Sequence, residues 1–290
     1  MSMKFGLSGY FKIDVIKPDG SVVELAPFQK NLILDSGLDN NLSKDYCHVG
    51  TGNSTPVVTQ TGLDARVAVA NGPNQGGSTN SGSDPYYTSS NRLYTFSVGA
   101  FNGEALTEIG IGGSGISSLW SRSLIKDSGG VPTTITVLND EILRVTYTVR
   151  IYPPTVDNVV TINGYECTTR AAHANATSYW YFSYYGMGSS SGSFIHYTNG
   201  GLGAITSFPT GTADGMTSGG GIFTITYPAP RTVRISRYSS LSAGNFANGI
   251  SAVLFRSESG FGFQVGFVPP IPKTSNDVLT LEFDISWDRA

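Results

Sequence analysis

Apolar and polar residues alternate over several short stretches of the chain, which is the pattern of strands with one buried face. Residues 11–15 alternate first, then Pro18-Asp19-Gly20 interrupts the pattern, and residues 22–25 resume it. Proline presets φ at a turn and glycine accepts positive φ, so this segment is predicted to be a β-hairpin. A longer alternation covers residues 141–152 and ends at Pro153-Pro154.

The remaining elements are predicted with weaker patterns. Residues 31–38 favour a short helix, because Asn31 stands where an N-cap would and apolar residues recur about one turn apart. Residues 71–91 consist mostly of Gly, Ser, Asn and Thr, which predicts a long exposed loop. Further strands are predicted at residues 46–49, 92–98, 106–111, 179–185, 223–227 and 232–236.

Two blocks of sequence occur twice. Residues 279–288 repeat the alternation of residues 143–152, and residues 250–257 are similar to residues 116–123 at nearly the same distance upstream. We interpret this as an internal duplication, although alternating strands can also match by chance. The predicted fold is all-β, with two tandem antiparallel β-sandwich domains at residues 1–154 and 155–290 and one short helix in the first.

Composition agrees with this fold class and excludes several functions. The 290 residues include 36 glycines, only 13% are charged, and the net charge is −3. Such a composition argues against a helical bundle or an α/β enzyme, and it provides no basic excess for nucleic acid. No apolar run is long enough for membrane insertion, and the N-terminus lacks the apolar core of a signal peptide. Cys47 and Cys167 are expected to be buried thiols, with a disulfide as the alternative.

Motifs for cofactors and metals lack the context they need. Gly110 to Gly115 has the G-x-G-x-x-G spacing, but another strand pattern follows where a dinucleotide site requires a helix. His48, His173 and His196 have no metal-ligand spacing. We therefore predict no cofactor and no metal site.

Carboxylates and aromatic residues are the other candidates for chemistry. Three carboxylate pairs could supply the two acids of a glycosidase, but acids at strand ends and turns are routinely solvated, so no catalytic residue is assigned. The pairs are Asp140 with Glu141, Glu104 with Glu108, and Asp284 with Asp288. Exposed Tyr and Trp beside Gly/Ser loops suit protein contacts or stacking on sugars, although the same residues also fill sandwich cores. The candidate contact surface consists of Tyr86, Tyr87, Tyr179, Trp180, Tyr181, Tyr184 and Tyr185.

Several segments of residues 8–154 follow one another in an order that is similar to that of a known protein family. They are Phe11-x-Ile13-x-x-Ile16-x-Pro18-Asp19-Gly20, residues 28–39, residues 49–56, Glu108-Ile109-Gly110-Ile111-Gly112, residues 119–127 and residues 133–153. In this order the first half of the chain resembles the opening of tail-fibre-like structural proteins of tailed bacteriophages. The second half is connected to that family only through the duplication.

The resemblance implies a structural component of a bacteriophage tail, such as a tail fibre, a tail-tip or a collar or attachment protein. It implies a virion protein made in the host bacterial cytoplasm, whose partners are other tail proteins and further copies of itself in a trimer or ring. It carries no catalytic residue, so no enzyme is expected. The first half would then dock and the second would face outward. The alternative is a receptor-binding module that recognises a host surface glycan or pilus through the aromatic residues and loops at 179–221; a glycan-degrading enzyme is the third hypothesis.

Overall fold

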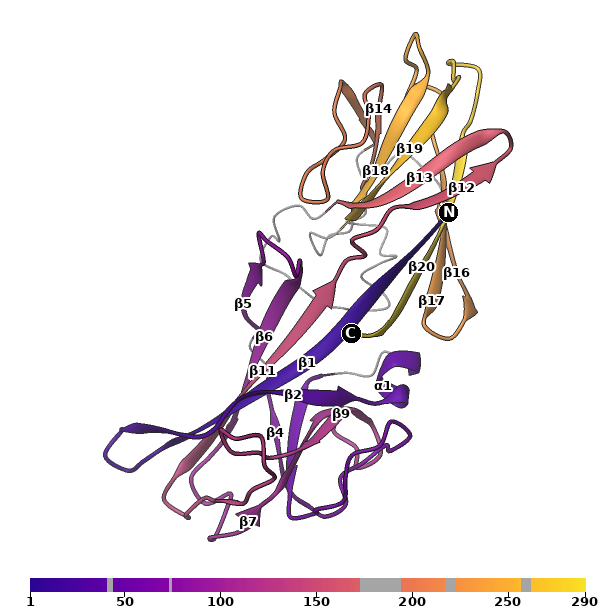
Figure 1. Cartoon of the computed structure of the whole chain (residues 1–290). Coiled ribbons are helices and arrows are strands. Elements are labelled where there is room, and N and C mark those ends of the chain that lie inside the picture. The colour runs from indigo at the N-terminus through magenta and orange to yellow at the C-terminus, as the bar shows by residue number, and fades with distance from the viewer. Residues whose placement is uncertain (41–43, 73–74, 173–193, 217–222, 257–261) are drawn as a thin grey trace. The chain divides into compact units, whose positions relative to one another are not determined.

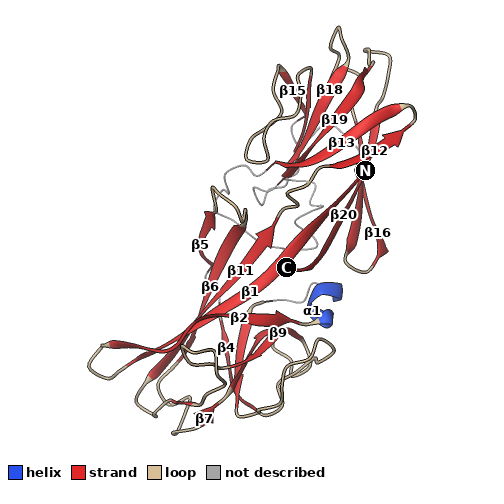
Figure 2. Cartoon of the chain, viewed as in Figure 1, coloured by secondary structure: helices blue, strands red, loops and turns tan. Residues whose placement is uncertain are grey.

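The chain is almost entirely β-structure. The computed structural model describes residues 1–40, 44–72, 75–172, 194–216, 223–256 and 262–290 (Figure 1). Within these residues it has twenty strands and one helix, α1 (Asp35–Asn40). Figure 2 colours the strands red and the helix blue. The prediction of an all-β, sandwich-like fold with one short helix is confirmed. In the same described part, no helix is long and apolar enough to cross a membrane.

Two compact units divide the chain. One unit comprises Met1–Gly6, Ser78–Thr88 and Ile151–Asp288, and the other comprises Leu7–Gly77, Ser89–Arg150 and Arg289–Ala290. We call the first the terminal unit and the second the central unit. The main break therefore falls at residues 150–151, beside the Pro153-Pro154 pair. The division is not strictly tandem. Residues 1–6 and 78–88 belong to the terminal unit although the residues that flank them in sequence belong to the central unit, and residues 289–290 belong to the central unit.

The central unit contains two layers of strands that meet around Tyr147. The first part of β2 pairs with β1, and its last residues, Leu32 and Ile33, pair with β9, from which the sheet continues in the order β8-β3-β4. Tyr147 of β11 meets Trp120 of β9 edge-on at 6.4 Å between ring centroids, and both are buried. The strands are β1 (Ser2–Ile16), β2 (Val22–Ile33), β3 (Tyr46–Gly50), β4 (Arg66–Asn71), β5 (Gln75–Asn80), β6 (Thr88–Phe96), β7 (Ala105–Leu106), β8 (Glu108–Gly112), β9 (Leu119–Leu124), β10 (Ile135–Thr136) and β11 (Ile142–Tyr152).

Two predictions from the sequence are wrong. Residues 31–33 continue β2, and α1 begins only at Asp35. Asn31 is no N-cap, because its buried amide donates to Ser121 Oγ at 2.6 Å and to Tyr147 OH at 3.2 Å. The segment 71–91 is likewise no continuous loop, since it includes β5 and the start of β6. Its backbone groups form a ladder with neighbouring strands, which the polar composition did not reveal.

The terminal unit is a six-stranded sheet that packs against a second layer. The sheet order is β12-β13-β19-β18-β14-β15, and β16, β17 and β20 form the other layer. Phe283 of β20 joins them, because its ring lies 5.9 Å from Phe255 of β18 and 5.0 Å from Phe263 of β19. The strands are β12 (Asn158–Ile162), β13 (Tyr165–Ala172), β14 (Phe194–Thr198), β15 (Ala213–Met216), β16 (Phe223–Ala229), β17 (Thr232–Tyr238), β18 (Ile250–Arg256), β19 (Gly262–Ile271) and β20 (Thr280–Arg289).

The blocks behind the predicted duplication lie in strands with different neighbours. β9 pairs with β8, the strand that precedes it, whereas β18 pairs with β19, the strand that follows it. The duplication therefore stays a prediction from the sequence.

A tight turn at Asn163-Gly164 joins β12 and β13. Both residues have positive φ, 52° and 84°, as a two-residue hairpin turn requires. A Cβ on Gly164 would meet nothing within 4 Å. A side chain at this position would therefore affect stability only through the strain of its positive φ. We expect Gly164→Ala to lower the free energy of unfolding by about 1 kcal/mol. Gly201 has equal space without positive φ, so Gly201→Ala is the control and should change stability by less than about 0.5 kcal/mol. Equal losses in urea unfolding would contradict this.

Candidate functional site

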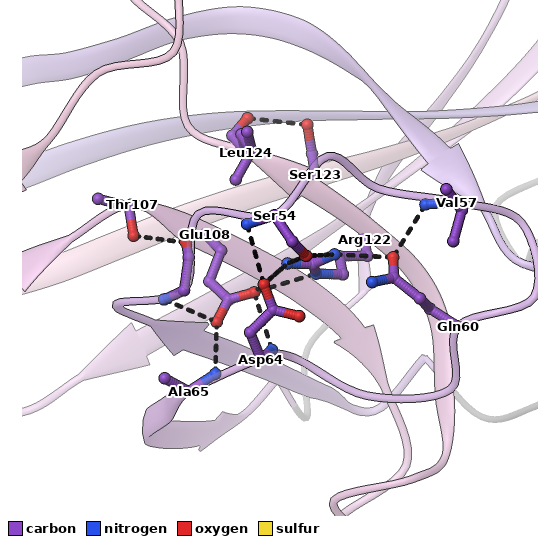
Figure 3. Close-up of polar contacts among 11 residues, drawn as sticks. Ser54, Val57, Gln60, Asp64, Ala65, Thr107, Glu108, Arg122, Ser123 and Leu124 are labelled. Carbon is purple, nitrogen blue, oxygen red and sulfur yellow. Dashed lines mark hydrogen bonds and ion pairs between the residues drawn. The ribbon is translucent and has the colours of Figure 1, made fainter.

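A buried pair of opposite charges lies on two neighbouring strands of the central unit. Arg122 of β9 and Glu108 of β8 are both fully buried. The Nε and Nη2 atoms of Arg122 lie 3.0 and 2.8 Å from Glu108 Oε2. Two charge-assisted hydrogen bonds to one carboxylate fix both side chains, as Figure 3 shows.

The Glu108 carboxylate also holds a loop by its backbone. Oε1 accepts from Gly52 N at 3.0 Å and from Ala65 N at 2.9 Å, and Oε2 accepts from Asp64 N at 3.2 Å. These three N–H groups come from the two ends of residues 51–65, which we call the anchored loop. Because five donors surround this buried carboxylate, it serves as an anchor and faces no solvent from which a substrate could approach.

The Arg122 guanidinium holds the same loop by its side chains. Nη2 donates to Asp64 Oδ2 at 2.7 Å, Nη1 donates to Gln60 Oε1 at 2.7 Å, and both nitrogens lie 3.3 Å from Ser54 Oγ. Hydrogen bonds from Ser54, with the charge of Arg122, hold the pKa of Asp64 below its usual value. The loop therefore carries an ionised carboxylate that binds the same guanidinium as Glu108, so one cation is shared by two carboxylates.

Backbone contacts close the anchored loop into a compact unit. Thr51 N donates to Ala65 O at 2.9 Å, and Leu119 N donates to Thr61 O at 3.0 Å. Asp35 N, at the start of α1, donates to Val58 O at 2.8 Å. Closely spaced ends and internal packing are the properties of an Ω-loop. The fixed loop exposes two apolar side chains, Val57 at 50% and Val58 at 36%.

The structure separates the carboxylate pairs weighed from the sequence. Of Glu104 and Glu108, only Glu108 belongs to the buried network, while Glu104 accepts from Asn102 N nearby in the chain. Asp140 is an exposed turn residue, and the other three acids form ion pairs. They are Glu141 with Lys17, Asp284 with Arg234 at 2.7 Å, and Asp288 with Arg231 at 3.0 Å and with Lys4 at 3.4 Å.

The Gly110–Gly115 motif and His48 are parts of the central sheet and its turns. Gly110–Gly115 spans β8 and the turn to β9, so a hairpin follows where a nucleotide site needs a helix. His48 is buried with Nε2 2.7 Å from Gly113 O, and burial lowers its pKa. Among the described residues no group of three potential ligands could hold a metal ion, and His173 lies outside them.

Both cysteines are free and buried, so the expected thiols are confirmed. Burial raises the pKa of Cys47 and of Cys167, which keeps both protonated. Cys167 lines a half-open, mainly apolar cavity of about 300 Å³ in the terminal unit, together with Ile162, Phe267 and Leu281.

The predicted aromatic contact surface is described only in part. Tyr86 and Tyr87 are half-buried, and the Tyr87 ring packs against Tyr152 at 5.8 Å. The other five residues, Tyr179, Trp180, Tyr181, Tyr184 and Tyr185, lie outside the described residues.

A half-buried lysine beside Trp120 predicts a pH-dependent stability. Lys44 Nζ lies 4.8 Å from the centroid of the Trp120 ring, and burial lowers the pKa of this lysine to about 7. The unfolded chain then binds more protons than the folded chain between about pH 7 and 10.5, so stability should rise with pH over this window.

We expect Lys44→Met to raise the free energy of unfolding by about 2 kcal/mol at neutral pH, and the gain should shrink as pH approaches 10. Urea unfolding of both proteins across this range measures the difference. Lys4→Met changes an exposed lysine and should show no such trend. A gain that is constant with pH would rule out this assignment for Lys44.

Comparison with known proteins finds no matching family model, no similar curated protein and no similar solved structure.

Proposed function

We propose that this chain is a structural component of a bacteriophage tail, and that the anchored loop is one of its contact surfaces with a neighbouring tail protein or a second copy of the chain. The observation that supports this most is the use of a fully buried Arg122–Glu108 pair to hold a loop that exposes two valine side chains. A loop that is already rigid loses little conformational entropy on binding, so its apolar contacts contribute more fully to affinity.

The sequence supports the same proposal from another direction. Residues 49–56, 108–112 and 119–127 are among the segments that resemble tail-fibre-like proteins. They include the start of the anchored loop and the two strands from which Glu108 and Arg122 extend. The resemblance thus includes the residues that build the anchor.

The paired substitution Val57→Asp with Val58→Asp tests the proposal. Both side chains are exposed, so the free energy of unfolding should change by less than about 0.5 kcal/mol. Two carboxylates at an apolar contact should reduce incorporation of the chain into phage particles at least tenfold. Quantitative mass spectrometry of purified particles measures the copy number.

The matched control is Val131→Asp, at a position that is 59% exposed in another turn of the same unit. This variant should incorporate normally. Normal incorporation of the double variant would show that the anchored loop is not the contact. Absence of the unmodified chain from particles would overturn the tail assignment itself.

The alternative function is a receptor-binding module that recognises a host surface glycan or pilus, for which the sequence points to the aromatic residues and loops at 179–221. A glycan array and a host-cell binding assay distinguish the two functions. A tail component without receptor contact should bind neither, whereas a receptor-binding module should bind at least one of them, and the Val57→Asp, Val58→Asp variant should bind it as well as the wild type does.

A further inference from the structure

Lys273 is a buried lysine whose amine faces a carboxamide instead of a carboxylate. The residue is 5% exposed and lies in the connection between β19 and β20. Its Nζ atom is 2.9 Å from Asn245 Oδ1 and 3.4 Å from two backbone oxygens, those of Leu241 and Thr274. Within the described part of the chain, no carboxylate lies in ion-pair contact with this amine. Burial lowers the pKa of Lys273, so its neutral amine is easier to reach than that of an exposed lysine.

Asn245 is held in a fixed position opposite this amine. Its Nδ2 atom donates to Leu241 O at 2.8 Å, which orients Oδ1 toward Lys273. The residue lies in the connection between β17 and β18, so the two side chains come from different connections of the terminal unit. Two groups held together in this way react as if at very high local concentration.

A carboxylate is attached to the same loop. Asp214 Oδ2 accepts from Gly244 N at 2.6 Å, directly before Asn245 in the chain. Its negative charge also acts on Lys273. Asp277, the other acid that acts on Lys273, is already bonded to Thr274 N at 2.9 Å and Thr274 Oγ1 at 2.6 Å. The charge of Asp277 has the larger effect on Lys273, whereas Asp214 is bonded to the residue that precedes Asn245. Asp214 is therefore the acid attached to the Asn245 loop and the candidate proton carrier.

We propose that Lys273 and Asn245 form an intramolecular amide cross-link. The lone pair of the neutral Lys273 Nζ attacks Asn245 Cγ, and the bond from Cγ to Nδ2 breaks. One proton passes from Nζ through the Asp214 carboxylate to the departing nitrogen, which leaves as ammonia. Amine and carboxamide together give a secondary amide and ammonia, so the reaction needs no oxidant, metal or other reactant.

The cross-link would enclose β18 and β19 in a covalent loop. These strands carry Phe255 and Phe263, which pack in the core of the terminal unit. Closing the loop removes conformations from the unfolded chain and so stabilises the fold. This inference concerns the durability of the terminal unit and is independent of the contact role proposed for the anchored loop.

Intact-mass and peptide mass spectrometry of the purified full-length chain tests the proposal. The wild-type protein should be lighter than its sequence by one ammonia, and its digest should contain a branched peptide that joins Asn245 to Lys273. Asn245→Ser and Lys273→Met should both have the full mass of their sequences. Asn276→Ser, an exposed asparagine in the same connection as Lys273, is the matched control and should keep the cross-link.

Asn245→Asp provides an independent check, because an aspartate would lose water in place of ammonia and reach the same final mass as the cross-linked wild type. Asn245 is exposed, so its variants remain informative even where Lys273→Met does not fold. A wild-type chain of full mass, with Asn245 and Lys273 in separate peptides, would falsify the proposal. Ammonia loss without the branched peptide would equally overturn it, since it would place the loss at another asparagine.

Discussion

Arg122→Met is expected to lower the free energy of unfolding by about 3–5 kcal/mol. The substitution leaves the Glu108 carboxylate fully buried, with its backbone donors but without a cation. It also removes the bonds that Arg122 makes to Asp64 and Gln60, so the anchored loop loses its side-chain holders. Urea unfolding followed by circular dichroism measures the loss.

Arg234→Met is the matched control for this prediction. Arg234 is 40% exposed and pairs with Asp284, so its loss should lower the unfolding free energy by less than about 1 kcal/mol. Adding Glu108→Gln to Arg122→Met removes the stranded charge, and the double variant should lose less than the sum of the two single changes. A loss for Arg122→Met no larger than that of the control would mean that the buried pair does not hold the loop.

Phe283→Ala is expected to lower the free energy of unfolding of the terminal unit by about 3–5 kcal/mol. Phe283 is 1% exposed, and its ring joins the two layers by contacting Phe255 and Phe263. Alanine leaves a cavity between the sheets that the paired strands cannot close. Phe283→Leu keeps most of the volume and should lower stability by roughly 1.5 kcal/mol or less.

The control for the Phe283 prediction is Val278→Ala, two residues before β20. Val278 is 56% exposed, so truncating it should change stability by less than about 0.5 kcal/mol. Guanidinium unfolding of the three variants measures the order. If Phe283→Ala and Phe283→Leu lose the same amount, cavity formation is not the cause.

Strands with one buried face could be predicted from the sequence, because their alternation records the packing directly. The alternation at residues 141–152 corresponds to β11 (Ile142–Tyr152), with Leu143, Val145 and Tyr147 buried. Asn31 shows where local patterns fail, since a residue suited to an N-cap instead bonds side chains far along the chain. The Asn163-Gly164 hairpin is indicated locally, because Asn-Gly is a residue pair that accepts positive φ at both positions.

The sequence also contains an indication of the buried charge pair, although a weaker one. Arg122 and Glu108 are the single charged residues of strands that are otherwise apolar or small, and an isolated charge in such a strand must be paired when buried. The sequence does not show which opposite charge lies alongside, because that depends on the register of β8 against β9. The role of Lys273 opposite Asn245 depends in the same way on two connections that meet only in the folded unit.

The hydrogen bond from Thr51 N to Ala65 O closes the ends of the anchored loop on themselves. The residues that tie the loop down are Ser54, Gln60 and Asp64, whereas the Val57 and Val58 side chains point outward and make no hydrogen bond. The side chains that hold the loop are therefore different from those that it exposes, so the exposed residues can be substituted while the contacts with the sheet are kept. Substitutions at Val57 and Val58 can therefore change the chemistry of this surface without the stability loss that a change in the core would bring.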